Sequence, residues 1–307
     1  MCAAAHTLSA SSGHWEKHEQ PIVETEGERM MRLGCHVSIR GGYLAAAKRA
    51  TAIGAQSYQY FPKNPRSLAV KTFDERDAAL CRAYCREHGL VSIAHSPYPV
   101  NIAAADERLR KAVVASLRND LAICEACGSV GLVVHFGKYR GKTPLQAYQN
   151  SLQCINEVLD GWRGEAKLLI ENLAGEGTDI GMTLEESVQI RKLSASPDKI
   201  GFCLDTCHLF ASGVWDGGNW AEVRDRARQI GYFDHLLALH LNDSMYPAHS
   251  RRDRHEQAGR GRIGAAALRD VLLTPELANV PVVLETPVGT DGTHAAEMAY
   301  VRGLAAR

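Results

Sequence analysis

The sequence lacks a long apolar run, an excess of one charge and an even set of cysteines. No apolar stretch approaches the roughly 18 residues that a membrane span needs, so we expect a cytoplasmic protein with no membrane partner. Lys plus Arg and Asp plus Glu each number 35, so net charge does not point to a nucleic-acid partner and does not exclude local basic patches. The nine cysteines are scattered through apolar segments, which favours buried thiols over a disulfide framework.

Residues 1–30 differ from the rest of the chain. They are Ser-rich and then Glu-rich, and they contain no apolar core of a signal peptide. We therefore expect a flexible N-terminal extension over 1–30 and a single folded domain over 31–307. Met30 and Met31 directly precede the first expected strand, which makes either one a candidate for the natural start.

After residue 31, continuous apolar strands alternate with amphipathic helices. Strands are expected at 32–38, 55–61, 90–96, 131–136, 167–173, 200–206, 236–243 and 280–286. Helices are expected at 43–53, 73–88, 106–127, 144–159, 183–193, 220–230, 265–272 and 293–304. Eight such units predict an α/β fold of the (β/α)8 TIM-barrel type, with a parallel eight-stranded sheet. A doubly wound open sheet is the alternative, but the segment 38–42 is a poor match to a phosphate-binding turn.

Most of these strands end at a histidine or a carboxylate. In a barrel these ends share one rim, where chemistry is located. An unpaired charge at a buried strand end costs several kcal/mol, so many of them together predict a common neutralising group, most simply a metal cluster. The nine candidate ligands are His95, His135, Glu171, Asp205, His208, His240, Asp253, His255 and Glu285.

The chemistry of this set favours Zn²⁺, with Mn²⁺ or Fe²⁺ as alternatives, because imidazole and carboxylate donors occur without thiolates. One zinc takes three or four protein ligands, so nine are too many for one ion and suit two or three. Taken singly, each of these residues is more often structural than a ligand. The pair Cys124 and Cys127 lies in a helical pattern with no second pair nearby, and we interpret it as packed thiols.

The sequence resembles the endonuclease IV family of apurinic/apyrimidinic (AP) endonucleases, also called deoxyribonuclease IV. The resemblance is carried by motifs in order along residues 34–287. They are Gly-Cys-His-Val-Ser at 34–38, Ala-His-Ser-Pro-Tyr at 94–98, Val-Val-His at 133–135, Glu-Asn-Leu-Ala-Gly at 171–175, Leu-Asp-Thr-Cys-His at 204–208, His-Leu-Asn-Asp-Ser at 240–244, Asp-Arg-His at 253–255, Gly-Arg-Gly-Arg-Ile-Gly at 259–264 and Leu-Glu-Thr-Pro at 284–287. The 204–208 and 253–264 blocks are the most specific.

The resemblance implies a xylose-isomerase-like TIM barrel holding three zinc ions, with Mn²⁺ as an alternative in one or more sites. His95, His135 and Glu171 would hold the first ion. Glu171 would bridge to a second ion held by Asp205, His240 and Glu285, and His208, Asp253 and His255 would hold the third. Similar enzymes cut duplex DNA 5′ to an abasic site by attack of a metal-bridging hydroxide. They leave 3′-hydroxyl and 5′-deoxyribose phosphate ends and trim blocked 3′ ends.

Rim loops supply the expected DNA contacts. Tyr98 on a loop next to basic residues fits insertion into a duplex that must expel a sugar, although a packed tyrosine in a solvated loop is the alternative. The expected DNA-binding residues are Lys63, Arg66, Tyr98, Lys138, Arg254, Arg260 and Arg262. The chain departs from the family after the fourth strand, where His-Phe-Gly-Lys at 135–138 stands in place of the usual His-Pro-Gly, so that Phe136 replaces the proline and Lys138 adds a possible phosphate contact. It also departs at Pro99, where the family usually has an apolar residue. We expect a monomer.

Two other functions remain open at this stage. A sugar isomerase or epimerase on the same barrel would share the rim carboxylates, but the set His208, Asp253 and His255 would have no role in chemistry on a free sugar. A DNA-lesion binder without catalysis would be expected to lose ligands, and all nine are present.

Overall fold

The computed structural model describes residues 31–139 and 143–306. The extension predicted over 1–30 lies outside these residues. In the described part, no helix is long and apolar enough to cross a membrane.

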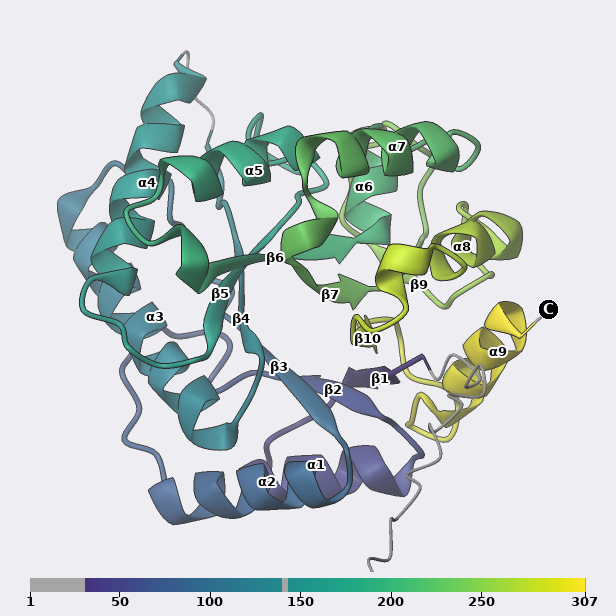
Figure 1. Cartoon of the computed structure of the whole chain (residues 1–307), viewed down its shortest axis with the longest axis horizontal. Coiled ribbons are helices and arrows are strands. Elements are labelled where there is room, and N and C mark those ends of the chain that lie inside the picture. Colours follow the sequence, from purple (N-terminus) through teal and green to yellow (C-terminus); the bar gives the residue numbers. More distant parts are fainter. Residues whose placement is uncertain (1–30, 140–142, 307) are drawn as a thin grey trace, which may run out of the picture. The chain divides into compact units, whose positions relative to one another are not determined.

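Eight parallel strands close into a barrel in the order in which the chain supplies them (Figure 1). They are β1 (Leu33–His36), β2 (Ser57–Tyr60), β3 (Val91–His95), β4 (Gly131–His135), β5 (Lys167–Glu171), β6 (Ile200–Asp205), β7 (Leu236–His240) and β10 (Val282–Leu284). β10 pairs with both β1 and β7, so the sheet has no free edge. The prediction of a TIM barrel is confirmed, and the open-sheet alternative is excluded.

Helices cover the outside of the barrel (Figure 1). They are α1 (Tyr43–Ala52), α2 (Glu75–Glu87), α3 (Glu107–Cys127), α4 (Pro144–Leu159), α5 (Leu184–Leu193), α7 (Trp220–Ile230), α8 (Ala265–Leu272) and α9 (Ala295–Ala305). A further short helix, α6 (Thr206–Ser212), follows β6 directly at the rim. Three short 3-10 turns lie at Pro197–Lys199, Phe233–His235 and Pro275–Leu277. Each of the eight predicted helices is present within one to two residues at either end, and α6 is an additional one.

Apolar side chains fill the barrel and the layer around it. The barrel interior is packed by Ile93, Val133, Leu169, Cys203, Ala238 and Val283, all almost fully buried. Since the strands are covered on both faces, most of them read as continuous apolar runs rather than alternating ones, although the buried strand β2 reads Ser-Tyr-Gln-Tyr. Polar side chains are therefore displaced to the strand ends, and this places the functional residues on one rim.

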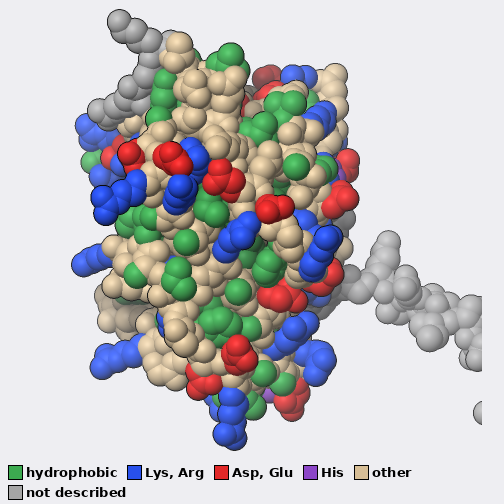
Figure 2. All heavy atoms as spheres, turned by 90° about the vertical axis from the view of Figure 1, so that its left-hand side faces the viewer, with side chains coloured by type: hydrophobic (Ala, Val, Ile, Leu, Met, Phe, Trp, Pro, Cys, Tyr) green, Lys and Arg blue, Asp and Glu red, His purple; other side chains and the backbone are tan. Residues whose placement is uncertain are grey.

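The outer layer has no single-sign surface on the side of α3 and α4. Figure 2 shows Lys and Arg side chains interspersed there with Asp and Glu. Cys124 and Cys127 on α3 are fully buried free thiols, as the sequence predicted.

Three elements on the rim, a pair of short strands and one helix, have no counterpart among the predicted ones. A short antiparallel pair joins β8 (Asp243–Ser244) to β9 (His255–Glu256), and Ser244 is level with His255. Helix α6 starts directly after β6, where the Asp205 carboxylate accepts a hydrogen bond from the backbone N–H of His208 at 2.8 Å. Of these three elements, β9 carries the predicted ligand His255 and α6 carries the predicted ligand His208.

Candidate metal centre

Five neighbouring strands end at five of the predicted ligands. β3, β4, β5, β6 and β7 end at His95, His135, Glu171, Asp205 and His240 respectively. Parallel pairing makes two pairs of these ends level, because His135 pairs with Glu171 and Asp205 pairs with His240. The other two neighbours are offset by two residues, since His95 pairs with Val133 and Glu171 pairs with Cys203, and an offset of two keeps the side chains on the same face. The side chains at these ends therefore converge.

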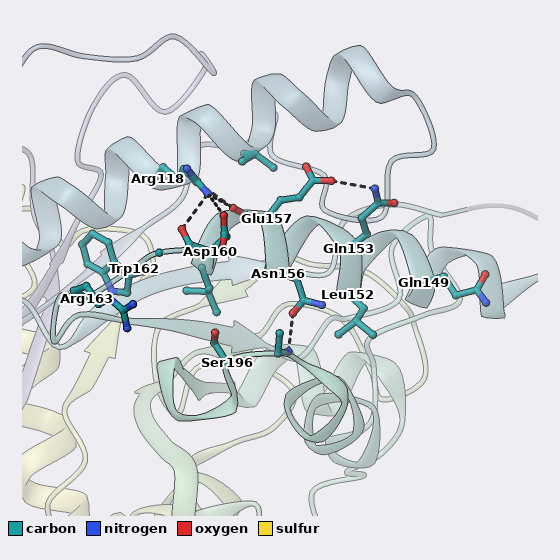
Figure 3. Close-up of a pocket in the computed structure, with 14 residues that line it drawn as sticks. Arg118, Gln149, Leu152, Gln153, Asn156, Glu157, Asp160, Trp162, Arg163 and Ser196 are labelled. Atoms are coloured by element: carbon teal, nitrogen blue, oxygen red, sulfur yellow. Dashed lines mark hydrogen bonds and ion pairs between the residues drawn. The ribbon is translucent and has the colours of Figure 1, made fainter.

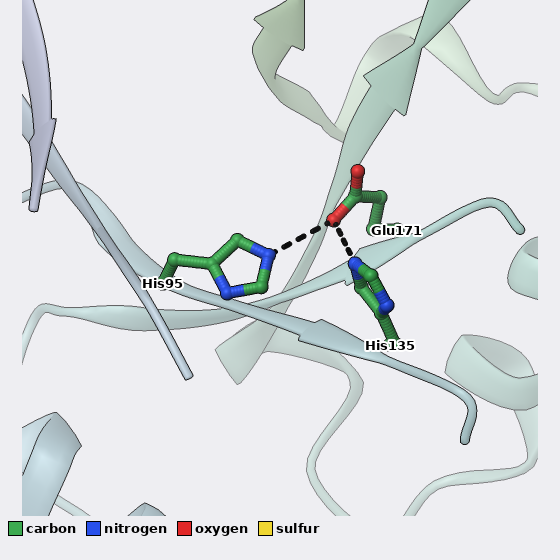
Figure 4. A group of neighbouring side chains, drawn as sticks. All are labelled: His95, His135 and Glu171. Carbon is green, nitrogen blue, oxygen red and sulfur yellow. Dashed lines mark ion pairs between the residues drawn. The ribbon is translucent and has the colours of Figure 1, made fainter. Parts of the chain in front are cut away.

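The first group consists of two imidazoles that point at one carboxylate oxygen (Figure 4). Oε2 of Glu171 lies 2.8 Å from Nε2 of His135 and 3.4 Å from Nε2 of His95. Glu171 is fully buried, yet this oxygen takes part in no hydrogen bond among the described residues. Three lone-pair donors thus face one another within 4.8 Å.

The second group shares Glu171 with the first. Nδ1 of His240 lies 3.0 Å from Oε1 of Glu171, 3.1 Å from Oε2 of Glu285 and 3.8 Å from Oδ2 of Asp205. The four ligand atoms lie within 4.8 Å of one another. Because the two oxygens of Glu171 face different groups, this carboxylate has the geometry of a bridge between two cations.

The third group is assembled from α6 and the β8–β9 segment. Oδ1 of Asp253 lies 3.1 Å from Nε2 of His208 and 3.2 Å from Nε2 of His255. Both Nε2 atoms are buried and take part in no hydrogen bond among the described residues. The structure thus brings all nine predicted ligands into three adjoining groups.

Hydrogen bonds behind the ligands orient their rings. Nδ1 of His95 lies 2.8 Å from the carbonyl oxygen of Ser96, and Nδ1 of His208 lies 2.9 Å from that of Asn172. A carbonyl oxygen only accepts, so each Nδ1 must carry the proton and each Nε2 keeps its lone pair for the centre. Supporting carbonyls of this kind are typical of metal-binding histidines.

Gln59 supports the second group and was not predicted from the sequence. Its Oε1 lies 2.7 Å from Nε2 of His240, which leaves Nδ1 of that ring free to face the carboxylates. Its Nε2 donates to Oε1 of Glu285 at 2.5 Å. The signal in the sequence is weak, since it is one amide within the buried strand β2.

Glu176 and Asn242 support two of the other carboxylates. Glu176 accepts a hydrogen bond from the backbone N–H of Asp253 at 2.9 Å. Asn242 donates to Oδ2 of Asp205 at 2.7 Å. These contacts join loops that are distant in the sequence and hold the ligands in place.

The carboxylates make the centre strongly attractive to positive charge. Burial by itself would lower the pKa of His208, but Asp205 and Asp253 outweigh burial and hold this pKa well above its usual value. Burial is likewise outweighed at His255, where Asp205 and Asp253 are the main causes of a pKa of about 9. Burial would raise the pKa of Glu171, but His135 and His240 keep it well below its usual value.

These observations test whether the residues fit divalent cations. Imidazole nitrogens and carboxylate oxygens face each other without hydrogen-bond geometry in the first and third groups, as expected where a cation lies between them. The donor set is nitrogen and oxygen, with three or four donors per group, which suits zinc. Cys203 and Cys207 lie close to two of the groups, and burial raises the pKa of each thiol to about 12, so neither is a ready thiolate ligand.

Comparison with known proteins identifies the family. A family model described as "Xylose isomerase-like TIM barrel" matches residues 47–305. A "Probable endonuclease 4" from Symbiobacterium thermophilum is 40% identical over 274 residues, covering 89% of this chain and 99% of the relative. The chain belongs to the endonuclease IV family. The chain also superimposes on the crystal structure of endonuclease IV from Thermus thermophilus with a TM-score of 0.79 and 32% sequence identity. The match covers 89% of this chain and 98% of that one.

Sugar epimerases share the fold of this endonuclease IV family member. A 3-keto-D-glucoside 4-epimerase from E. coli superimposes with a TM-score of 0.65 at 16% identity, covering 90% of this chain and 100% of that one. At that identity the likeness concerns the barrel alone.

A pocket of about 530 Å³ opens onto the metal centre. It is lined by His135, His208 and Asp253 on the inside and by Tyr98 and Lys138 nearer the solvent. Tyr98 is 70% exposed and packs edge-on against Phe61 with ring centroids 5.2 Å apart, so its ring stands on the rim. Its backbone N–H donates to the carbonyl of Pro65 at 2.8 Å, which joins the loops after β2 and β3.

The expected basic contacts divide into free and engaged side chains. Among the described residues, the exposed side chains of Arg66, Lys138, Arg260 and Arg262 have no ion-pair or hydrogen-bond partner. Arg254 is exposed, but its guanidinium is 3.1 Å from Glu176, so it must leave this pair to reach a phosphate.

The prediction of Lys63 as a DNA contact is wrong. Its side chain is 3% exposed, and Nζ lies 3.0 Å from Oδ1 of the buried Asp120 and donates to the carbonyl of Ser116 at 2.9 Å. Lys63 therefore anchors the loop after β2 to α3 and does not face the rim.

A larger hollow, of about 1030 Å³, lies between α3, α4 and the segment 195–196 (Figure 3). Several of its polar groups are engaged in structural contacts. Arg118 donates to the carbonyl of Glu157, and Asn156 accepts from Ser194 and from the backbone of Ala195. None of the three ligand groups contributes to its lining.

Proposed function

We propose that this chain is a DNA-repair endonuclease that hydrolyses the phosphodiester bond 5′ to abasic sites in duplex DNA. It leaves 3′-hydroxyl and 5′-deoxyribose phosphate ends, trims blocked 3′ ends and acts in the cytoplasm as a monomer. The observation that carries the proposal is the convergence of nine nitrogen and oxygen donors into three groups, two of which share Glu171. Relatives named endonuclease 4 support it.

Three zinc ions are proposed for the three groups, with Mn²⁺ as an alternative in one or more of them. His95, His135 and Glu171 would hold the first ion. Glu171 would also hold the second ion, together with Asp205, His240 and Glu285. The third ion would be held by His208, Asp253 and His255. When bound, such closely spaced ions neutralise phosphate oxygens and lower the pKa of water, as in other metal-dependent phosphodiesterases. Glu171 fixes the spacing of the first two groups, because its two oxygens face them separately.

Residues around the centre would bind and orient the DNA. Lys138 borders the pocket that also exposes His135 and Asp253, so a phosphate in this pocket would meet a free ammonium group. Arg66 and Tyr98 lie on two joined loops, and an exposed ring there can occupy space that an abasic nucleotide vacates.

The group formed by His208, Asp253 and His255 favours phosphodiester cleavage over sugar epimerisation. Chemistry on a free sugar uses one or two ions, so this third group would have no role in it. The complete ligand set also speaks against a lesion binder without catalysis.

Nicking of a labelled duplex with one abasic site tests the proposal. We expect cleavage on the 5′ side of the lesion, a 3′ end that a DNA polymerase extends directly, and no cleavage of the matching intact duplex. Removal of metal by a chelator should abolish cleavage, and zinc should restore it. A zinc-loaded protein that leaves the abasic duplex intact but epimerises a ketose would refute the proposal.

A further inference from the structure

Asp243 is a fully buried carboxylate on β8 that belongs to none of the three ligand groups. Its oxygens accept backbone N–H groups at distances between 2.7 and 3.4 Å. The donors are Ser244, Gly259, Gly261, Ile263 and Gly264. Among the described residues, no Lys, Arg or His forms an ion pair with it, so amide dipoles alone stabilise its charge.

The segment that wraps around Asp243 presents two arginines to solvent. Residues 259–264 read Gly-Arg-Gly-Arg-Ile-Gly, and the amides of four of them turn inward to the carboxylate. Arg260 and Arg262 are exposed, and neither guanidinium has a partner among the described residues. The Asp243 carboxylate therefore orders the backbone of segment 259–264, in which the only charged side chains are the two unpaired arginines.

The fit between the segment and Asp243 is close at Gly261. A Cβ atom on this residue would lie 2.4 Å from Oδ1 of Asp243 and 2.5 Å from the carbonyl oxygen of Ser244. The amide of Arg262 donates to the same carbonyl at 2.7 Å. Because Ser244 also pairs with His255 across β8 and β9, the arginines are tied to the rim that holds the metal ligands.

We infer that Asp243 is a positioning residue that holds Arg260 and Arg262 against the phosphates of duplex DNA. The inference rests on the proposed function, since it names the part of the rim that grips the DNA backbone. Ordering the segment before binding spares the entropy that a flexible basic loop would lose on the DNA.

The direction in which Asp243→Asn changes DNA affinity distinguishes a positioning role of Asp243 from a purely electrostatic one. Asp243→Asn removes a negative charge, so Coulomb attraction alone would strengthen DNA binding. The new amide also places N–H donors against backbone N–H donors, which should release the segment and weaken binding. Gly261→Ala disturbs the same contact from the loop side, because its methyl group would press on the carboxylate, and it changes neither the charge nor the identity of residue 243.

The test is a titration of full-length, zinc-loaded protein with an intact, uncleaved duplex at several salt concentrations. Arg260→Ala/Arg262→Ala should flatten the slope of log affinity against log salt by about 1.8, since each phosphate contact contributes about 0.9. Asp243→Asn and Gly261→Ala should each reproduce most of this loss. Adding Asp243→Asn to the double arginine variant should weaken duplex binding by less than about twofold further, because both changes act through the same contact.

Two control variants match these changes. Asp234→Asn removes an exposed carboxylate, and Gly303→Ala adds a methyl group where no atom lies within 4 Å. Both should bind like the wild type. The inference is overturned if Gly261→Ala binds the duplex as tightly as the wild type, if its salt slope is unchanged, or if the losses from Asp243→Asn and the double arginine variant add fully.

Failure of this inference is distinct from failure of the proposed function. A double arginine variant that binds intact duplex normally would sink the inference, while nicking by the wild type would leave the proposed function standing. If the wild type binds the duplex through these arginines but does not nick an abasic site, the proposed function fails and the positioning role remains.

Discussion

At the scale of single residues, Glu171 is the side chain that two ligand groups share. Glu171→Gln keeps the shape but leaves only a neutral carboxamide between two cations, so zinc affinity should fall with cleavage. We expect nicking to drop more than about 100-fold, a larger effect than losing an outer-sphere partner. Zinc analysis and the abasic-duplex assay measure both quantities, with the exposed Glu222→Gln as control. Near-normal nicking by a fully metallated variant would refute the bridging role.

Tyr98 is the exposed ring of the rim, and its removal should change selectivity rather than general affinity. Tyr98→Ala should lose roughly 1–3 kcal/mol of preference for the abasic duplex, because an aromatic side chain stacks only where a nucleotide has left. Binding to intact duplex and its salt slope should barely change, whereas Arg262→Ala should weaken both duplexes. Parallel titrations decide the matter. Equal weakening of both duplexes by Tyr98→Ala would mean that the ring merely packs on Phe61.

At the scale of elements, the loop after β2 is anchored by the buried pair of Lys63 and Asp120. Burial raises the pKa of Asp120 to about 7, while Lys63 acts in the opposite direction. Lys63→Met leaves the carboxylate without its cation, so the free energy of unfolding should fall by about 3–5 kcal/mol near neutral pH. The DNA salt slope should not change, because Lys63 does not face the rim.

The pH dependence of this loss has a defined sign. With Lys63 gone, the pKa of Asp120 in the folded state lies still further above its unfolded value, so folding favours the protonated acid. The destabilisation of Lys63→Met relative to wild type should therefore shrink as the pH falls from about 8 to about 5. Denaturant unfolding at each pH measures it. If the loss of unfolding free energy were the same at every pH, or if the DNA salt slope fell by about 0.9, Lys63 would instead be a solvent-facing side chain.

The same elements show what the sequence could not predict. Asp120 lies on α3, far along the chain from Lys63, and nothing in either local pattern reveals their contact. β8 and β9 contain two residues each, too few for a periodic signal. Asp205 ends β6 and is the N-cap of α6, and its carboxylate is also a member of a ligand group. The helix follows the strand without a break, so the apolar pattern does not reveal where the helix begins.

At the scale of the whole molecule, the alternation of apolar strands and helices was enough to predict a closed barrel. Covered strands favour polar groups at their ends, so His95, His135, Glu171, Asp205, His240 and Glu285 could be chosen from the sequence before any distance was known. His208, Asp253 and His255 could be chosen because they lie in the connections that follow two of these strand ends. The residues behind them, such as Gln59, depend on how strands meet in space. Arg260 and Arg262 could be predicted from the sequence as rim cations, but the hydrogen bonds from their segment to Asp243 could not.

Removal of residues 1–30 should leave the molecule stable and active. All strands of the barrel lie between Leu33 and Leu284, so the closed sheet does not require the extension. We expect the melting temperature and the rate of nicking of the truncated protein to match those of the full chain. A marked loss of soluble expression or of cleavage would show that these residues pack on the barrel or bind DNA.

The central claim is a three-ion centre built by nine side chains, and the zinc content of nicking-competent protein tests it most directly. Native mass spectrometry combined with elemental analysis should find about three zinc ions per chain, because each of the three groups offers three or four donors. Glu171→Gln should reduce this number, and Glu222→Gln should not. One ion or fewer in protein that still nicks an abasic duplex at full rate would contradict the account.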